Sequence, residues 1–241
     1  MIAFLTSSPC IYGAPRAILN PENGFVDNLR SCLPENPRCL FVASAPDDIA
    51  FTDRVAEEMA ACFYEAGLGF SELYKLDRRN QQEAQLLIWE SDFIILSGGH
   101  VPTQNAFFLE IGLRQMLENY QGVILGISAG SMNAAGRVYA QPEEEGESVP
   151  EFQRFLPGLG ITQFNVLPHY QQVKDDYLDG KRLYEDVTFA DSWGEHFFVF
   201  VDGTYLLIEE GRTTLYGEAY LLRNGVMKKI SDVGDALVLE E

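Results

Sequence analysis

The sequence predicts an α/β fold, in which a mostly parallel sheet is sandwiched between helices and continues into an antiparallel extension near the C-terminus. Over the first 130 residues, short apolar runs alternate with longer amphipathic runs. This alternation of strands and helices is typical of a parallel sheet that is covered on both faces. In the last third, short strand-like runs are separated by turn dipeptides such as Asn224-Gly225, which favours antiparallel strands.

The short apolar runs predict the buried strands of the parallel sheet, and each is bounded by Gly, Pro or Ser. They cover residues 2–6, 39–43, 70–76, 93–96 and 122–127. Amphipathic runs predict helices over residues 20–33, 55–66, 82–89 and 104–119. Asn20 and Pro21 supply a cap and a proline at the start of the first helix, and Gly67 ends the second. This order of elements is that of a parallel sheet with helical crossovers.

The pattern becomes less regular after residue 128. A short helix over residues 129–139 precedes the acidic loop 142–147, which we interpret as a solvated turn. A further strand is predicted over residues 160–167. The predicted strands of the antiparallel extension cover residues 197–201, 205–208, 213–216, 219–222 and 226–229.

Length, composition and charge narrow the class of protein. A chain of 241 residues with 46% apolar residues suits one large domain, and no repeat or linker divides it, so residues 1–241 are expected to form a single domain. Acidic residues outnumber basic ones by 36 to 17, for a net charge of −19. Nucleic acids and anionic membranes are bound through Lys and Arg, so neither is an expected partner.

Two further features concern location and metals. The N-terminus has no basic segment before its short apolar run, and no window approaches the ~18 apolar residues of a membrane span, so we expect a cytoplasmic protein. The four cysteines form no C-x-x-C pair and have no histidine nearby, which argues against a zinc site. Reduced thiols, no metal and no cofactor are therefore expected.

The most specific motif is Gly126-Ile127-Ser128-Ala129-Gly130, which directly follows a predicted strand. A nucleophilic serine at a tight strand-to-helix turn needs small neighbours, because the backbone there is strained and packs against the next helix. The first N–H groups of that helix would lie beside the hydroxyl. Ser128 is therefore the candidate nucleophile, and the N–H of Ala129 is a candidate donor to an oxyanion.

A second oxyanion donor should come from another strand end. Leu96-Ser97-Gly98-Gly99-His100 follows the predicted strand 93–96, and glycines there let a main-chain N–H approach a substrate carbonyl oxygen. Gly99 is the candidate donor, and Gly98 and His100 are candidate substrate contacts. The segment is not a P-loop, since no Gly-Lys-Ser/Thr follows.

A serine nucleophile needs a base and an acid that orients it. Of the three histidines, His169 lies just beyond a predicted strand end, where the active-site residues of open α/β sheets gather. Asp202 follows the predicted strand 197–201 and is the candidate acid. The alternative for Asp202 is that it only begins an Asp-Gly turn. Of the other histidines, His100 lies beside the glycine loop, and His196 is interpreted as a residue at the edge of a strand.

Together, the run GISAGSM, the preceding LSGGH, the later PHY and the final acid-Gly element resemble peptidase family S51, which includes aspartyl dipeptidase (peptidase E) and the cyanophycinases. The resemblance spans roughly residues 2–225. It implies a fold similar to that of the class I glutamine amidotransferases (a flavodoxin-like three-layer arrangement), with a Ser-His-Glu triad in which serine replaces cysteine. It also implies a small peptide as substrate, and assembly as a homodimer is left open.

By position, Ser128, His169 and Asp202 match the triad of the family, and Gly99 and Ala129 match its main-chain oxyanion donors. Asp202 is a departure, since it stands where the family has glutamate and is one methylene shorter. The glycine loop departs too, because it continues as His-Val-Pro-Thr where the family usually has Asn-Thr.

Members that cut after an N-terminal aspartate need a cation near that side chain, and Arg182 lies near where the family places an arginine. The strong negative charge of this chain opposes an acidic substrate, so aspartyl specificity is left open.

Two other functions remain open from the sequence. In an α/β-hydrolase esterase the order is serine, acid, histidine, which would make His196 the base with Asp191 or an earlier acid. A binding or regulatory protein could also keep this fold without the chemistry. The leading hypothesis is a serine peptidase that forms an acyl-enzyme on Ser128.

Overall fold

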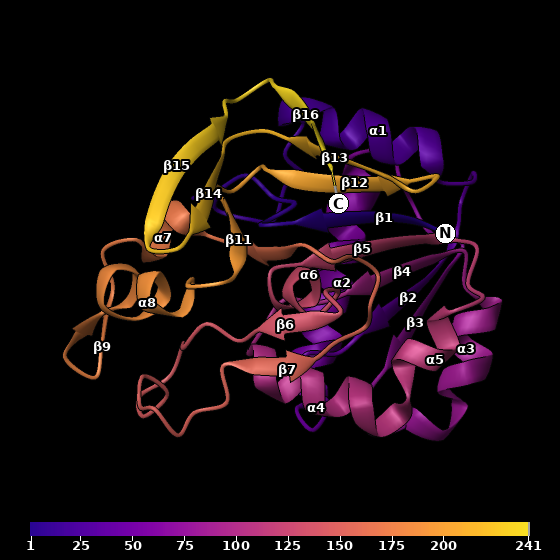
Figure 1. The fold of residues 1–241 in the computed structure, drawn as a ribbon. Helices are drawn as coiled ribbons and strands as arrows, with labels where there is room; N and C mark the ends of the chain where they lie inside the picture. The colour runs from indigo at the N-terminus through magenta and orange to yellow at the C-terminus, as the bar shows by residue number, and fades with distance from the viewer. Residues whose placement is uncertain (241) are drawn as a thin grey trace.

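A computed structural model describes residues 1–240. Its central feature is an eight-stranded sheet (Figure 1). In spatial order the strands are β16 (Ala236–Leu239), β13 (Arg212–Tyr216), β12 (Tyr205–Glu209), β1 (Ile2–Thr6), β5 (Val123–Ile127), β4 (Phe93–Leu96), β2 (Arg38–Val42) and β3 (Glu72–Leu76). The strands β1, β5, β4, β2 and β3 run parallel to one another. The strands β12, β13 and β16 each pair with their neighbours in antiparallel fashion. The predicted mostly parallel sheet is confirmed.

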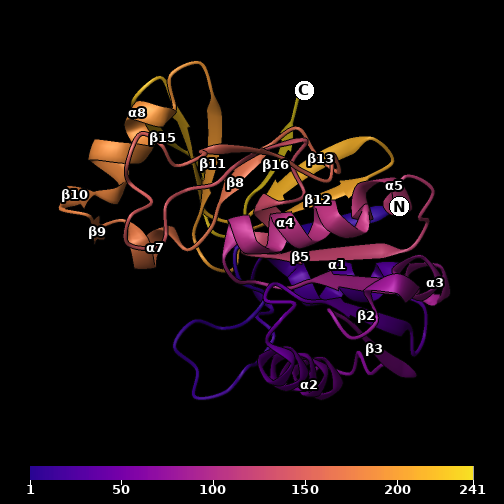
Figure 2. The same cartoon turned by 90° about the horizontal axis from the view of Figure 1, so that it is seen from below.

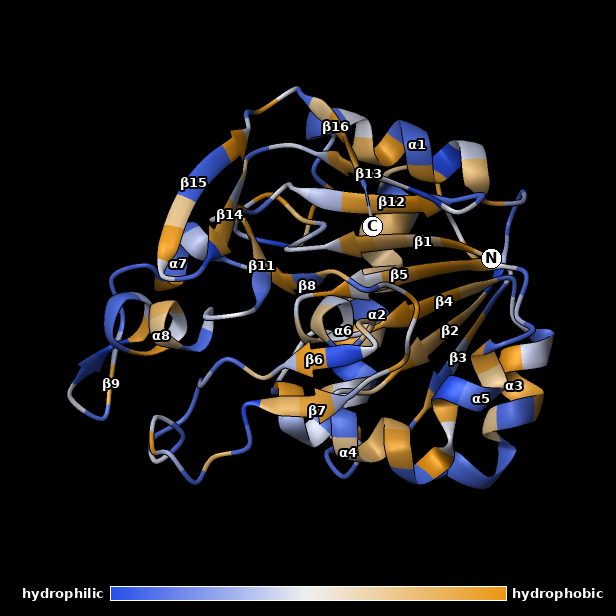
Figure 3. Ribbon diagram, viewed as in Figure 1, coloured by the Kyte–Doolittle hydropathy of each residue, from blue (hydrophilic) through white to orange (hydrophobic). Residues whose placement is uncertain are grey.

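Helices cover both faces of this sheet (Figure 2). α1 (Phe25–Cys32) and α2 (Ile49–Glu65) pack on one face, and α3 (Ala84–Glu90), α4 (Val101–Ile111) and α5 (Leu113–Leu117) pack on the other. Short 3₁₀ turns, Glu22–Gly24 and Gln81–Glu83, precede α1 and α3. Successive side chains of a strand point to opposite faces of the sheet. Because helices cover both faces, the central strands are apolar along their length, as Figure 3 shows.

The predicted helix over residues 104–119 differs in detail, because it begins at Val101 and is divided into α4 and α5. Gly112 separates them with φ of 69°, a left-handed conformation that glycine adopts without steric cost. The predicted helix 129–139 is wrong beyond its first turn, since α6 covers only Ala129–Met132 and Arg137–Tyr139 forms strand β6. The carbonyls of residues 133–135 accept hydrogen bonds from the N–H groups of residues 159–162, so they cannot continue a helix.

The antiparallel extension divides between two sheets. β12 and β13 extend the central sheet as predicted, joined by β16, which the sequence did not indicate. The next strands instead form a second sheet in the order β15 (Val226–Ser231), β14 (Ala219–Arg223), β11 (His196–Phe200) and β8 (Asn165–Leu167). Gly217, with φ of 103°, lies between β13 and β14, where the chain leaves one sheet for the other.

The remaining elements lie around the second sheet and between the two sheets. They are β7 (Phe155–Pro157), which pairs with β6, the hairpin of β9 (Tyr177–Leu178) and β10 (Lys181–Arg182), the helices α7 (Tyr170–Val173) and α8 (Phe189–Asp191), and a π-helical turn at Leu183–Thr188. One apolar cluster joins α6 and β1 to β8 and β11, so the two sheets share a core. Within residues 1–240, no helix has both the length and the apolar character needed to cross a bilayer.

Candidate active site

The candidate site lies where strands from both sheets end together. Thr6, at the end of β1, is paired with Ile127, at the end of β5. In the second sheet, β8 and β11 run parallel and end side by side. Ser128 follows β5, His169 follows β8 and Asp202 follows β11. Residues far apart in the sequence therefore meet because they share one position, just beyond the carboxyl end of a parallel strand.

Ser128 occupies a strained turn between β5 and α6. Its φ of 51° and ψ of −112° lie outside the regions that non-glycine residues usually adopt. The neighbouring glycines make this turn possible. A Cβ on Gly126 would lie 2.9 Å from the backbone nitrogen of Ser131, and one on Gly130 would lie 2.2 Å from the carbonyl oxygen of Leu96. Glycine is therefore required at residues 126 and 130, because there is no room for a side chain at either position.

The close approach at Gly130 leads to a prediction. A Gly130→Ala variant should lose about 1–3 kcal/mol of unfolding free energy, because the contacting atom is a backbone carbonyl that cannot move cheaply. Its activity should also fall, since any shift displaces Ser128. Denaturant unfolding tests this, with Gly136→Ala as control, because a Cβ on Gly136 meets no atom closer than 3.8 Å. Equal stability of the two variants would contradict the prediction.

His169 forms hydrogen bonds with both of the other candidate residues. Its Nε2 lies 2.9 Å from Ser128 Oγ, and its Nδ1 lies 2.7 Å from Asp202 Oδ1. A carboxylate only accepts hydrogen bonds, so Nδ1 carries the proton and Nε2 presents its lone pair to the serine hydroxyl. The structure therefore brings together the three residues that the sequence singled out, and the shorter aspartate reaches the imidazole without difficulty.

Asp202 is held in its ionised form by several donors. Its side chain is 4% exposed, and it accepts hydrogen bonds from Ser7 Oγ (2.6 Å) and Gln172 Nε2 (2.6 Å) in addition to His169. Burial alone favours the neutral acid, but these hydrogen bonds and the nearby imidazole outweigh it and hold the pKa of Asp202 below its ordinary value. The carboxylate is thus fixed as a permanent acceptor for the His169 ring.

Sequence reasoning missed Ser7 and Gln172. Ser7 also accepts the backbone N–H of His169 (2.8 Å), so it connects the base and the acid to the end of β1. Its place directly after a buried strand was the available signal, the same one that pointed to Ser128. Gln172 had no such signal, because its contact depends on how α7 turns after residue 169.

The predicted glycine loop lies beside the serine. A Cβ on Gly98 would lie 3.4 Å from Ser128 Cβ, and one on Gly99 would lie 2.4 Å from Ser44 Oγ. Ser44 Oγ also donates to the Gly98 carbonyl oxygen (2.7 Å), which holds the loop in place. Ala129 is the first residue of α6, and the first N–H groups of a helix have no acceptor within the helix. The glycine loop is thus packed beside Ser128, and Ala129 directly follows the serine in the chain.

A pocket of about 300 Å³ opens beside the serine and histidine. Ser128 and His169 line it together with apolar side chains that include Met132 and Leu183. Two carboxylates, those of Glu143 and Asp176, are also part of its wall. The pocket therefore combines a polar end, where the hydroxyl and imidazole lie, with a partly acidic wall.

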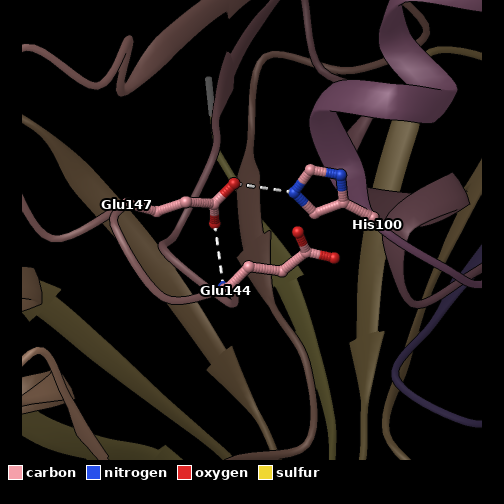
Figure 4. Close-up of side chains that lie close together, drawn as sticks. All are labelled: His100, Glu144 and Glu147. Atoms are coloured by element: carbon pink, nitrogen blue, oxygen red, sulfur yellow. Dashed lines mark hydrogen bonds and ion pairs between the residues drawn. The ribbon is translucent and has the colours of Figure 1, made fainter.

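The acidic loop is not simply a solvated turn, which corrects our interpretation. The Glu147 side chain is 12% exposed, and its carboxylate forms hydrogen bonds with His100 Nε2 (2.9 Å) and with the N–H of Glu144 (Figure 4). It also accepts the N–H of Glu143. Burial favours neutral Glu147, but these hydrogen bonds hold its pKa below its ordinary value. The carboxylate of Glu147 thus connects the acidic loop to His100, the residue that follows the two glycines of the glycine loop.

His100, Glu144 and Glu147 are also the described residues that could hold a metal ion, since their ligand atoms lie within 4.8 Å of one another. Both nitrogens of His100 already have partners, because Nδ1 lies 2.8 Å from Thr103 Oγ1. In this structure the cluster is a hydrogen-bonded contact between two loops. His100 is not among the residues that line the pocket beside Ser128, so its predicted substrate contact stays a prediction.

Arg182 and the residues of the esterase alternative lie elsewhere. Arg182, in β10, is paired with Asp186 and is not among the residues that line the pocket. His196 begins β11 with an exposed side chain. Asp191 accepts hydrogen bonds from Tyr139 and from Arg154. The structure thus gives no support to Arg182 as a substrate contact, or to a pairing of His196 with Asp191.

Known structures share this architecture. A crystal structure of a peptidase from an acI-B1 Actinobacterium matches with a TM-score of 0.68 and 15% identity, over 99% of this chain and 96% of that one. The 1.5 Å crystal structure of a candidate peptidase E protein from Listeria monocytogenes EGD-e matches with a TM-score of 0.60 and 15% identity, over 95% of this chain and 98% of that one. Among curated proteins, none matches. The fold is therefore that of peptidase E-like proteins.

The family model described as peptidase family S51 matches residues 20–216 of this chain. This range includes Ser128, His169 and Asp202. The chain belongs to peptidase family S51, which confirms the family that the sequence motifs indicated, and it is accordingly a peptidase by family.

Proposed function

We propose that the protein is a serine peptidase that hydrolyses small peptides through an acyl-enzyme on Ser128, with His169 as base and Asp202 as the residue that orients it. The observation that carries the proposal is the continuous hydrogen-bond chain from Ser128 Oγ through His169 to Asp202, with contacts of 2.9 and 2.7 Å. A serine hydroxyl is a weak nucleophile until an adjacent base takes its proton. Family membership supports the reaction class.

In the first half of the reaction, Ser128 Oγ attacks the carbonyl carbon of the scissile amide as its proton passes to His169 Nε2. A C–O bond forms, and the carbonyl oxygen becomes an oxyanion. Asp202 stabilises the imidazolium and keeps the ring in the tautomer that can accept this proton. His169 then gives the proton to the leaving nitrogen, the C–N bond breaks, and the acyl group stays on the serine.

The oxyanion would be stabilised by the main-chain N–H groups of Gly99 and Ala129. Both segments flank the serine, and the loop is held by Ser44 and by Gln104, whose Nε2 donates to Ser97 O (2.7 Å). Donors fixed before the reaction do not have to reorganise as charge develops, and one such donor contributes on the order of 10²–10³ in rate.

In the second half, water gives a proton to His169 Nε2 and attacks the acyl carbon. The ester bond to Ser128 then breaks, and the proton returns from the imidazole to the serine oxygen. The pocket of about 300 Å³ has room for one side chain or terminal residue of a substrate, which supports a small peptide.

A fluorophosphonate probe tests the proposal, because it reacts only with an activated serine. Wild-type protein should be labelled, and mass mapping should find the adduct on Ser128. Ser128→Ala should not be labelled. Ser131→Ala is the matched control, since Ser131 is in the same motif but its Oγ is buried and bonded to Thr6 O. Equal labelling of wild type and Ser128→Ala would overturn the proposal.

A further inference from the structure

On the basis of this proposed function, we propose that the pocket beside Ser128 binds a positively charged group of the substrate between the carboxylates of Glu143 and Asp176. The group is an ammonium or a guanidinium, supplied either by the free N-terminus or by a basic side chain. Both carboxylates line the pocket that Ser128 and His169 also line. A cation held there would lie next to the reacting carbonyl.

The two carboxylates come from different segments. Glu143 belongs to the acidic loop after β6, and Asp176 follows α7, the short helix that begins after His169. Within residues 1–240, neither carboxylate forms an ion pair with a basic side chain. Each is thus an acceptor without a cationic partner in the wall of a pocket that has room for one.

The nearby basic side chains are engaged elsewhere. Arg182 is paired with Asp186, Lys174 with Asp175, and Lys181 Nζ donates to the Ser148 carbonyl oxygen (2.7 Å). The pocket wall, as far as the structure describes the chain, contains no Lys or Arg. An aspartyl side chain would therefore meet two carboxylates and no cation, which argues against aspartyl specificity for this member of the family.

Four amides separate the two sources of charge. Argininamide carries both cations, N-acetylargininamide only the guanidinium, citrullinamide only the α-ammonium, and N-acetylcitrullinamide neither. Titration calorimetry at pH 7, where an α-amino group is still mostly protonated, should find at least one cationic amide with a Kd roughly tenfold or more below that of N-acetylcitrullinamide. The two single-charge ligands, N-acetylargininamide and citrullinamide, then identify the source, and N-acetylaspartamide, which carries only a carboxylate, should bind most weakly.

Charge-neutralising variants test the assignment to these residues. Glu143→Gln and Asp176→Asn should each reduce the preference for the cationic amide severalfold. Their matched controls, Glu145→Gln and Asp175→Asn, alter exposed neighbours outside the pocket wall and should preserve it. Equal binding of all four amides, tighter binding of N-acetylaspartamide, or a preference that survives both pocket variants would overturn the inference.

Binding and labelling separate this inference from the proposed function. If Ser128 reacts with the fluorophosphonate but cationic amides bind no better than neutral ones, the inference fails and the peptidase stands. If cationic amides bind through Glu143 and Asp176 but Ser128 is not labelled, the pocket assignment stands and the acyl-enzyme mechanism fails.

Discussion

Replacing Ser128 by alanine is expected to lower peptide turnover by roughly 10⁴-fold or more while the fold remains intact. The substitution removes the oxygen that lies 2.9 Å from His169 Nε2, and no other hydroxyl takes its place in the proposed mechanism. The backbone N–H of residue 128 still donates to Thr6 O, so the turn should persist. Steady-state kinetics on the peptide that wild type cleaves best measure the loss.

Two controls accompany this variant. Thermal denaturation should show a melting temperature close to that of wild type. His196→Ala should keep near wild-type turnover, because His196 lies at the exposed start of β11 and is the base only in the esterase alternative. Turnover of Ser128→Ala within roughly tenfold of wild type would show that another group is the nucleophile.

Asp202→Asn is expected to lower turnover by on the order of 10⁴-fold, as in comparable triads. The carboxylate accepts the Nδ1 proton of His169, whereas an amide nitrogen in its place would donate and favour the tautomer with its proton on Nε2. That tautomer cannot take the proton of Ser128. Ser7, which donates to the same oxygen as His169, would also lose its acceptor, whereas the remaining amide oxygen can still accept from Gln172.

The matched control for this variant is Asp186→Asn, which removes a carboxylate that pairs only with Arg182 on the surface. It should leave turnover unchanged. Wild-type turnover by Asp202→Asn, with the fold preserved, would mean that Asp202 only begins the Asp-Gly turn that the sequence also allowed.

The regular half of the fold was predictable because its signals are local. Four of the parallel strands of the central sheet are short apolar runs between breakers, and four of the helices follow apolar periodicity. The fifth, β3, was predicted as buried but is a partly exposed edge strand with the sequence ELYKL, because only one neighbouring strand covers it. Division of the last strands between two sheets was not predictable, because it depends on which edge each hairpin meets after Gly217. The short α6 was misjudged because the segment 159–162 takes the carbonyls that would have continued it.

The three residues of the candidate site could be predicted from the sequence because each has a local signal. Ser128 stands out because Gly126 and Gly130 are required around it, and His169 and Asp202 follow strand ends. The role of the acidic loop was missed because its charges alone are typical of a solvated turn. Only the tertiary structure shows that His100 holds Glu147 and that the loop forms part of the pocket wall.

The central claim is that Ser128, His169 and Asp202 act as one unit, in which Asp202 works only through the imidazole. The most direct test is kcat/KM for His169→Ala, Asp202→Asn and the double variant. If the claim holds, Asp202→Asn should cost little further rate once His169 has been removed, because the residues share one function. If instead the two losses multiply in the double variant, the residues act independently and the claim is contradicted.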